Sequence, residues 1–233
     1  MLSKDAIIAL LSRTDLFGGL AVHDLQACAA SFREVRFAKG QVLFARGEPG
    51  THLYLLVDGR VRLAITTEGG RELSLRHAVS GDLFGEIAVL DGGPRSAEAT
   101  ALTRVIAYSL ERSIFRDLQS ARPAIAARVI PFLCRRLRDT SDQLEAIALY
   151  PMEVRLARVL LCALNTRRVS PGPRVPLELG FSQTELARLV GASRPKVNAA
   201  LGVLETSGAI KRTLDRLFCD PVKLAELARR DDA

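Results

Sequence analysis

Residues 84–99, FGEIAVLDGGPRSAEA, place a glutamate and an arginine nine positions apart on either side of a Gly-Gly-Pro turn. The planar guanidinium of Arg95 could hold a phosphate by two hydrogen bonds, and the small residues after it would let backbone N–H groups approach the same anion. A carboxylate repels a phosphate, so Glu86 suits this site only if it faces a hydrogen-bond donor such as a sugar hydroxyl. A nucleotide whose phosphate is cyclised onto its own ribose presents both groups. An exposed Glu–Arg pair on a surface turn has the same residues, and the residues alone leave that alternative open.

The composition narrows the class of protein. The chain has 233 residues, 48% of them hydrophobic, which is enough for one large domain or two modest ones with a sizeable core. No stretch of about 18 uncharged apolar residues is present, and the N-terminal segment lacks the small-residue cleavage site of a signal peptide. We therefore expect a cytoplasmic protein without a membrane partner.

Chemistry that depends on cysteine or histidine has little support in the sequence. The cysteines are far apart and form no CxxC pair: Cys28, Cys134, Cys162 and Cys219. We expect buried, reduced thiols, no zinc or other metal site and no iron–sulfur cluster. The three histidines are isolated, so no catalytic constellation is present and we expect no enzyme. A lone histidine such as His77 is more often structural than a haem ligand, so we expect no haem.

Positive charge is concentrated in the last third of the chain. The net charge is +7, and the residues from Pro151 onward carry 14 basic and nine acidic side chains, which leaves +5 of that charge in 83 residues. A basic excess of this kind suits an anionic partner without specifying which one.

The N-terminal half changes its hydrophobic period. Residues 2–30 have apolar positions at helical spacing and predict two short helices. From about residue 35 to residue 110, short β-rich runs alternate with glycine-containing turns roughly every ten residues. The runs are residues 41–45, 52–57, 60–65, 72–78 and 105–110. This pattern predicts a small antiparallel barrel or sandwich.

Residues 113–150 return to a helical pattern, with breaks expected near Arg122-Pro123 and at Pro131. The residue before a proline is pushed out of the helical region, so Pro151 ends this helix and marks a domain boundary or hinge. Within the helix, spacings of four and three residues describe the seam of a two-stranded coiled coil: Leu133, Leu137, Thr140, Leu144 and Ile147. A buried stripe of a core helix would show the same spacing, but Thr140 is polar and needs a partner there.

Residues 181–205, FSQTELARLVGASRPKVNAALGVLE, have the pattern of a helix-turn-helix. Ser182 and Glu185 form a capping box at the start of the first helix, Gly191 permits the turn, and Ser193 can cap the second helix. The apolar positions of the second helix give it an inward face, made by Val197, Leu201 and Leu204.

The outward face of the second helix then carries Arg194, Asn198 and Ala199 near its N-terminus. In this motif that part enters a major groove, where arginine pairs with guanine and asparagine with adenine. Residues 210–212 and 216–218 could add a short basic hairpin, or wing. An αα-hairpin with a solvated face is the alternative, and the local basic charge favours DNA.

Taken together, these motifs resemble the catabolite activator and cyclic AMP receptor (Crp/Fnr) family of bacterial transcription regulators over nearly the whole chain. The matching segments are F-G-E-I-A-V followed after five residues by R-S-A-E-A, the helix and hinge RRLRDTSDQLEAIALYPMEVRLARVLL, and SQTELARLVGASRPKVNAALGVLE. The resemblance implies an α+β fold with an antiparallel β-roll (a double-stranded β-helix or jelly roll) and flanking helices in residues 1–120. It also implies a dimerisation helix and hinge in residues 121–150. A winged helix-turn-helix that binds DNA would then occupy residues 151–233.

The resemblance also implies roles for individual residues. Gly85 and Glu86 would meet the ribose of a cyclic nucleotide, and Arg95, Ser96 and the Ala97 amide its phosphate. Thr140 and Ser141 would contact the purine, which would account for a polar residue in the seam. On double-stranded DNA with a palindromic operator, Arg194 would read guanine. The backbone contacts would come from Gln183, Ser193 and Lys196.

A homodimer and RNA polymerase are the further partners that the family implies. The family's glutamate and second arginine on the recognition helix are replaced by Pro195 and Ala199, so its best-known operator does not carry over. Thr and Ser both donate and accept hydrogen bonds, so they suit adenine and guanine alike. The resemblance makes cyclic AMP the first expectation and cyclic GMP a second. A vestigial pocket, or one for another small effector, with constitutive DNA binding is the alternative function, and activation or repression is left open.

Overall fold

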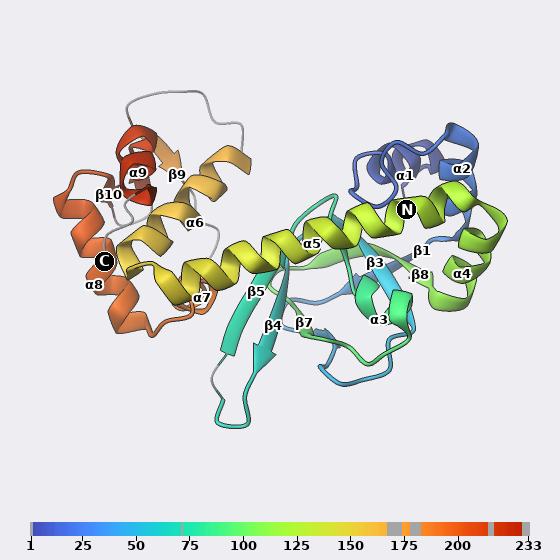
Figure 1. The fold of residues 1–233 in the computed structure, drawn as a ribbon, viewed down its shortest axis with the longest axis horizontal. Helices are drawn as coiled ribbons and strands as arrows, with labels where there is room; N and C mark the ends of the chain where they lie inside the picture. Colours follow the sequence, from blue (N-terminus) through green and yellow to red (C-terminus); the bar gives the residue numbers. More distant parts are fainter. Residues whose placement is uncertain (1, 71, 167–173, 178–182, 214–216, 230–233) are drawn as a thin grey trace. The chain divides into compact units, whose positions relative to one another are not determined.

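The computed structural model describes residues 2–70, 72–166, 174–177, 183–213 and 217–229 (Figure 1). The predicted capping-box residue Ser182 lies outside these ranges. The elements are, in chain order, α1 (Lys4–Leu11), α2 (Val22–Ser31), β1 (Arg33–Phe37), β2 (Val42–Phe44), β3 (His52–Asp58), β4 (Val61–Thr66), β5 (Glu72–Ala78), β6 (Leu83–Phe84), α3 (Glu86–Asp91), β7 (Glu98–Ala101), β8 (Val105–Glu111), α4 (Arg112–Ala121), α5 (Pro123–Leu149), α6 (Met152–Thr166), β9 (Val175–Leu177), α7 (Gln183–Leu189), α8 (Arg194–Thr206), β10 (Ile210–Arg212), β11 (Leu217–Cys219) and α9 (Pro221–Ala228).

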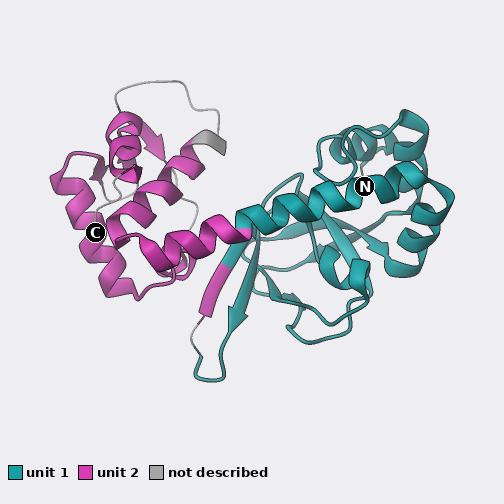
Figure 2. Ribbon diagram, viewed as in Figure 1, with its two compact units in different colours: residues 1–71, 75–139 teal, residues 72–74, 140–233 magenta. Residues whose placement is uncertain are grey.

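The chain divides into two compact units (Figure 2). Unit 1 comprises residues 1–71 and 75–139, and unit 2 comprises residues 72–74 and 140–233. The predicted division at residues 120 and 150 stays a prediction.

Unit 1 is built on two four-stranded sheets, with strand orders β1-β8-β3-β6 and β2-β7-β4-β5. The strand pairs whose registers are defined are antiparallel, and the longest of them joins β3 to β8. The expected antiparallel β-roll is therefore confirmed. β1, β6 and β7 are additional to the strands that the sequence pattern predicts.

The helices of unit 1 bury their apolar faces against one end of the roll, where α1, α2 and α4 gather beside β1 and β8 (Figure 1). Phe17 is fully buried there and meets the rings of Phe32 and Phe115 edge to face, with ring centroids 6.1 and 6.2 Å away. Such edge-to-face pairs add to the free energy gained by burial.

The first part of α5 packs on the same core through Ile125 and Phe132. Pro131 lies inside the helix, so the expected break at this residue is wrong. A proline in a helix interior costs about 3 kcal/mol. Because buried side chains on both sides of Pro131 hold the helix to the core, packing outweighs that cost.

Unit 2 contains a helical core and a small sheet of order β10-β11-β9. α6 contributes Leu156 and Leu160 to this core, and α8 contributes Leu201 and Leu204. The end of α5 is followed by Tyr150 and Pro151 before α6 begins, so the break predicted at Pro151 is confirmed. Among the helices that the structure describes, none combines the length and hydropathy that a membrane crossing requires.

Candidate functional site

The turn between β6 and α3 contains the first pair of predicted site residues. Gly85 has φ +74°, which a residue with a side chain adopts only with strain. A Cβ atom at this position would lie 2.7 Å from Nη1 of Arg95 and 3.4 Å from the carbonyl oxygen of His52. Glycine is therefore required both by the backbone conformation and by the close approach of Arg95.

Arg95 is buried, with 4% of its surface exposed. Its Nη1 donates a hydrogen bond to the Gly85 carbonyl oxygen and its Nη2 donates one to the His52 carbonyl oxygen, both at 2.7 Å. Its backbone pairs with residues 47 and 48, through Arg95 N to Glu48 O at 2.8 Å and Gly47 N to Arg95 O at 2.9 Å. Arg95 therefore joins the β6–α3 turn to the loop of residues 47–50 and to β3.

Aromatic rings form one wall of this site. The Arg95 guanidinium carbon lies 4.1 Å from the centre of the Phe44 ring, which is stacked with Tyr54 and Phe84. The Tyr54 and Phe84 centroids are 5.2 Å apart, and these two residues are register partners of β3 and β6. A cation over an aromatic face is stabilised most when it is desolvated, so the stack offsets part of the cost of burying Arg95.

The charge of Arg95 has no carboxylate partner among the described residues, and its Nε is buried without a hydrogen-bond partner. Burial lowers the pKa of the Arg95 guanidinium, while Tyr54, Glu48 and Glu86 act in the opposite direction. A buried charge without a counter-charge is costly. An anion beside Arg95 would supply the missing charge and could accept from Nε.

Glu86 is the first residue of α3 and is buried, and it pairs with Arg136 rather than with Arg95. Nε of Arg136 lies 3.6 Å from the Glu86 carboxylate, and Nη2 of Arg136 donates to the Leu83 carbonyl oxygen at 3.1 Å. Arg76 donates to the same carbonyl from β5, and burial together with Arg136 lowers the pKa of Arg76. The sequence interpretation missed both arginines, although Arg136 belongs to the basic helix segment that carries part of the family resemblance.

The remaining predicted ligand contacts are divided between the two units. Ser96 is exposed and the Ala97 side chain is buried, directly after Arg95 in unit 1. Thr140 and Ser141 are exposed residues of α5 that belong to unit 2. Their predicted contact with a purine stays a prediction.

In unit 2, α7 and α8 form the predicted helix-turn-helix. Gly191 lies between them with φ +66°, and Ala192 N donates to the Ala187 carbonyl oxygen at 2.9 Å to close the turn. The predicted inward face of α8 is confirmed, because Val197, Leu201 and Leu204 are buried.

The predicted DNA contacts lie on or next to this motif. Gln183 begins α7 and is partly buried, whereas the others are exposed: Ser193, Arg194, Lys196 and Asn198. Ser193 occupies the N-cap position of α8 but its side chain makes no capping hydrogen bond, so that detail of the prediction is wrong. The Ser193 hydroxyl is therefore not used by the helix backbone.

The predicted wing is present as β10 and β11, which pair antiparallel with Ile210 opposite Cys219. β9 adds a third strand through the pairing of Leu217 with Leu177. β11 covers the predicted positions 217 and 218, and Arg216, the first residue predicted for this strand, lies outside the described residues.

The structure describes the surroundings of the four cysteines and of the side chains that could bind a metal ion. In the described ranges, no group of three or more His, Cys, Asp and Glu side chains is arranged to bind a metal ion. Cys28 and Cys219 are buried, and burial raises the pKa of their thiols to about 11 and about 12. Cys134 and Cys162 are exposed, so the expectation of burial is wrong for these two.

Comparison with known proteins identifies both units. A family model described as a cyclic nucleotide-binding domain matches residues 34–122, and one described as a Crp-like helix-turn-helix domain matches residues 154–227. The "CRP-like cAMP-activated global transcriptional regulator" of Mycobacterium tuberculosis (strain CDC 1551 / Oshkosh) is 34% identical over 221 residues, which cover 94% of this chain and 99% of that protein. The chain belongs to the Crp/Fnr family.

Further relatives agree with this assignment. The "Cyclic AMP receptor protein" of Thermus thermophilus is 33% identical to this chain over 196 residues, which cover 84% of this chain and 88% of that protein. The crystal structure of a CRP/FNR-family transcriptional regulator from Thermus thermophilus has a TM-score of 0.70 at 28% identity, covering 86% of this chain and all of the other. The Crp/Fnr chain is therefore a transcription regulator with a DNA-binding helix-turn-helix, and not an enzyme.

If Arg95 holds the phosphate of a cyclic nucleotide, as proposed below, we expect Gly85→Ala to weaken the binding of cyclic AMP and cyclic GMP by about tenfold or more, because the new Cβ would occupy the space of the Arg95 guanidinium. Displacing the guanidinium removes a charged hydrogen bond to the phosphate, worth about 1.5–3 kcal/mol. Isothermal titration calorimetry measures this. Gly81→Ala is the matched control, since Gly81 has φ +93° but a Cβ atom there would meet no other atom within 4 Å. Equal affinities of the two variants would contradict the role given to Gly85.

Proposed function

We propose that the protein is a homodimeric transcription regulator of the cytoplasm whose affinity for DNA is controlled by a cyclic nucleotide. Cyclic AMP is the first candidate for this effector and cyclic GMP the second. The observation that carries the proposal is the buried Arg95 cation, which has an unpartnered Nε and no carboxylate beside it in the described part of the chain. The proposal assigns that counter-charge to the cyclic phosphate.

In this proposal the phosphate accepts the Arg95 hydrogens that the backbone carbonyls do not use. Nη1 and Nη2 now donate to Gly85 and His52, and each nitrogen carries a second hydrogen that a phosphate oxygen could accept. Ser96, which is exposed, and Ala97 follow Arg95 directly in the chain, and the proposal assigns the Ser96 hydroxyl and the Ala97 N–H to the same phosphate. Glu86 would accept from the ribose hydroxyl with an oxygen that its ion pair with Arg136 does not fully occupy.

The choice of nucleotide rests on relatives and on two residues outside unit 1. The Mycobacterium and Thermus relatives carry names that refer to cyclic AMP. We retain Thr140 and Ser141 as the purine contacts on the family resemblance. Both side chains can donate or accept, so the proposal keeps cyclic GMP as the second candidate.

A homodimer is supported by the apolar face of α5. Ile130, Leu137 and Leu144 recur every seven residues and are 71%, 68% and 67% exposed in the single chain. Leu133, which lies between the first two, is 38% exposed. A heptad row of exposed aliphatic side chains gains free energy when a second helix covers it, which favours a coiled-coil contact between two copies.

For DNA, we propose that the two copies place their α8 helices in successive major grooves of a palindromic operator, about 34 Å apart. Arg194 would read a guanine in each half-site, with phosphate contacts from Gln183, Ser193 and Lys196. RNA polymerase is the further partner that the family implies. The effector can promote DNA binding only to the extent that it binds the DNA-competent state more tightly.

The hinge at residues 149–152 would carry the change between states. Arg155 donates from Nε to the Tyr150 carbonyl oxygen at 2.8 Å and from Nη1 to the Val190 carbonyl oxygen at 3.3 Å. Arg158 lies over the Tyr150 ring, with its guanidinium carbon 3.7 Å from the ring centre. These contacts connect the segment after α5 with the turn of the helix-turn-helix, so a rotation there would be passed to α8.

A second function is a constitutive DNA-binding regulator with a vestigial pocket, or with a pocket for a different small effector. The observation that favours it is that two nitrogens of Arg95 already have backbone acceptors. A thermal-shift comparison of the protein with cyclic AMP, with cyclic GMP and without ligand separates the two, since only an effector-controlled protein is stabilised by one of them.

We expect Arg95→Leu to reduce cyclic nucleotide affinity by about 100-fold or more, because two charged hydrogen bonds to the phosphate are lost. Titration calorimetry measures the affinity, and circular dichroism shows whether the β-roll is retained. Arg95→Lys keeps the charge without the planar fork and should fall between the wild type and the leucine variant. Unchanged affinity in Arg95→Leu would refute the pocket assignment.

We expect Leu144→Glu to convert the dimer to a monomer, because two carboxylates would face each other across the seam. Size-exclusion chromatography with light scattering gives the mass. Leu149→Glu is the control, since Leu149 is 73% exposed on the same helix but lies off the heptad row. A dimer that survives Leu144→Glu, or is lost equally in both variants, would show that α5 does not form the seam.

We expect Arg194→Ala to lose the preference for one base pair in each half-site, by about 1–3 kcal/mol. Fluorescence anisotropy with single-base variants of a selected operator measures this preference. A uniform loss of affinity for all sequences would instead assign Arg194 to a phosphate.

A further inference from the structure

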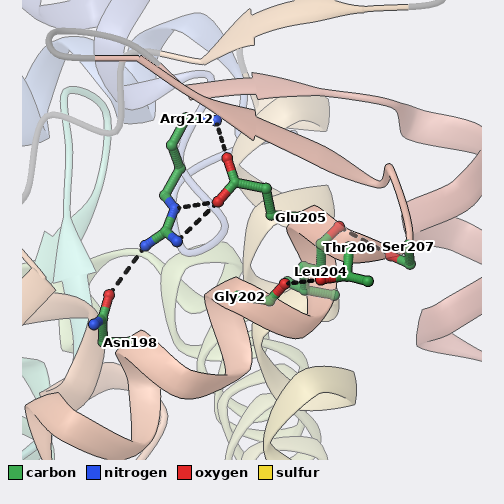
Figure 3. A network of polar contacts seen from close by, with 7 residues as sticks. All are labelled: Asn198, Gly202, Leu204, Glu205, Thr206, Ser207 and Arg212. Carbon is green, nitrogen blue, oxygen red and sulfur yellow. Dashed lines mark hydrogen bonds and ion pairs between the residues drawn. The ribbon is translucent and has the colours of Figure 1, made fainter.

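Three side chains of unit 2 form a network between the recognition helix and the wing, which we call the wing clamp: Asn198, Glu205 and Arg212 (Figure 3). Nη1 of Arg212 donates to Oδ1 of Asn198 at 3.0 Å. Nε of Arg212 donates to Oε2 of Glu205 at 2.9 Å, and Nη2 lies 2.8 Å from the same oxygen. The backbone N–H of Arg212 donates to the other oxygen, Oε1, at 3.0 Å.

The local sequence explains why these residues meet. Asn198 and Glu205 are seven positions apart on α8, so they lie on one face of the helix two turns from each other. α8 ends at Thr206, and the chain turns back so that β10 brings Arg212 alongside that face (Figure 3). Because Glu205 holds both the backbone and the guanidinium of Arg212, the arginine has little freedom to turn away.

The contact with Arg212 determines which way the Asn198 amide points. A guanidinium carries only donors, so the Asn198 atom that faces it must be the carbonyl oxygen Oδ1. The amide nitrogen Nδ2, a donor, is then on the other side of the group. Asn198 is exposed and lies one helical turn after Arg194, on the part of α8 that would meet base edges.

We propose that Arg212 is a positioning residue that makes Asn198 read DNA as a hydrogen-bond donor. This inference rests on the proposed entry of α8 into the major groove. Guanine offers two acceptors there, N7 and O6, whereas cytosine offers only a donor. The bidentate pairing of asparagine with adenine needs both Oδ1 and Nδ2 for one base edge, whereas in the wing clamp Oδ1 already accepts from Arg212. Asn198 therefore favours guanine over adenine and rejects cytosine, in contrast to the adenine contact that its residue type suggests.

The positioning role of Arg212 differs from a general electrostatic attraction between a basic side chain and DNA. The positive charge of Arg212 is matched by Glu205, whose pKa is held below its ordinary value by hydrogen bonds from the Arg212 backbone and side chain. Because this pKa is lowered on folding, the contribution of the pair is complete above the ordinary glutamate pKa and is lost only as the pH falls through the lowered value. At neutral pH Arg212 thus adds little net charge to the surface. Its neighbour Lys211 is exposed and takes no part in the clamp.

The decisive experiment compares Arg212→Met with Lys211→Met, two substitutions that each remove one positive charge from β10. Full-length protein with cyclic AMP is titrated by fluorescence anisotropy against four duplexes that differ only at the base pair facing Asn198, and the series is repeated with cyclic GMP. The wild type should prefer guanine over adenine at this position by about two- to tenfold, the range of one hydrogen bond. Arg212→Met should lose this preference or shift it towards adenine. Lys211→Met should keep the ranking while it weakens all four complexes.

Two further measurements test the cause of such a shift. Glu205→Gln, which keeps the shape of the side chain but removes its charge, should loosen the clamp and reduce the guanine preference in the same direction. In free ¹⁵N-labelled protein, the side-chain amide resonances of Asn198 should move in Arg212→Met and stay in place in Lys211→Met.

An unchanged base ranking in Arg212→Met, or a uniform loss equal to that of Lys211→Met, would overturn the inference. If the wild type binds all duplexes alike, the proposed sequence-specific function fails. The amide resonances then still test the contact between Arg212 and Asn198, because they are measured without DNA. A resonance pattern that is identical in Arg212→Met and the wild type would refute the clamp itself.

Discussion

Burying the Arg95 guanidinium costs free energy, which backbone acceptors and aromatic faces offset only in part. The conformation of the β6–α3 turn supplies some of these contacts. Gly85 provides a carbonyl oxygen and, having no side chain, the space that the guanidinium occupies. His52 provides a second carbonyl oxygen, and Phe44 provides a ring face. Glu48 and Glu86 act on the charge from a distance, but in the described chain no carboxylate forms an ion pair with Arg95. We propose that an anion takes that place.

Spacing along the chain was sufficient to select Arg95, Glu86 and Gly85 as candidates, because all three belong to one short segment. The stack of Phe44, Tyr54 and Phe84 was not predicted, since its rings meet only through the register of β2, β3 and β6. The pairing of Glu86 with Arg136 was missed for the same reason, because it joins α3 to a helix fifty residues later. Long-range register is a property of the folded sheet and has no local pattern.

The elements missed or misjudged in sequence have comparable causes. In β7, Glu98–Ala101, only Thr100 has a high strand propensity, and the strand forms because β2 and β4 pair with it on either side. Pro131 has a strong local preference against a helix interior, and α5 continues through it because its neighbours are packed in the core. In unit 2, the inward face of α8 follows its apolar period, whereas the wing clamp depends on a strand that turns back onto the helix. The residue type of Asn198 therefore suggested adenine, and only the neighbouring Arg212 shows which end of the amide is available.

The heptad row on α5 has a consequence for the amount of protein in the cell. Aliphatic side chains that remain in water in the single chain contribute to stability only when they are covered. If a second copy covers them, as we propose, folding and association become one linked equilibrium, and the stability of each chain rises with the total concentration. The amount of protein in the cell would then control DNA binding in addition to the effector. At low protein concentration the dimer dissociates, and a monomer cannot bind both halves of a palindrome at any effector concentration.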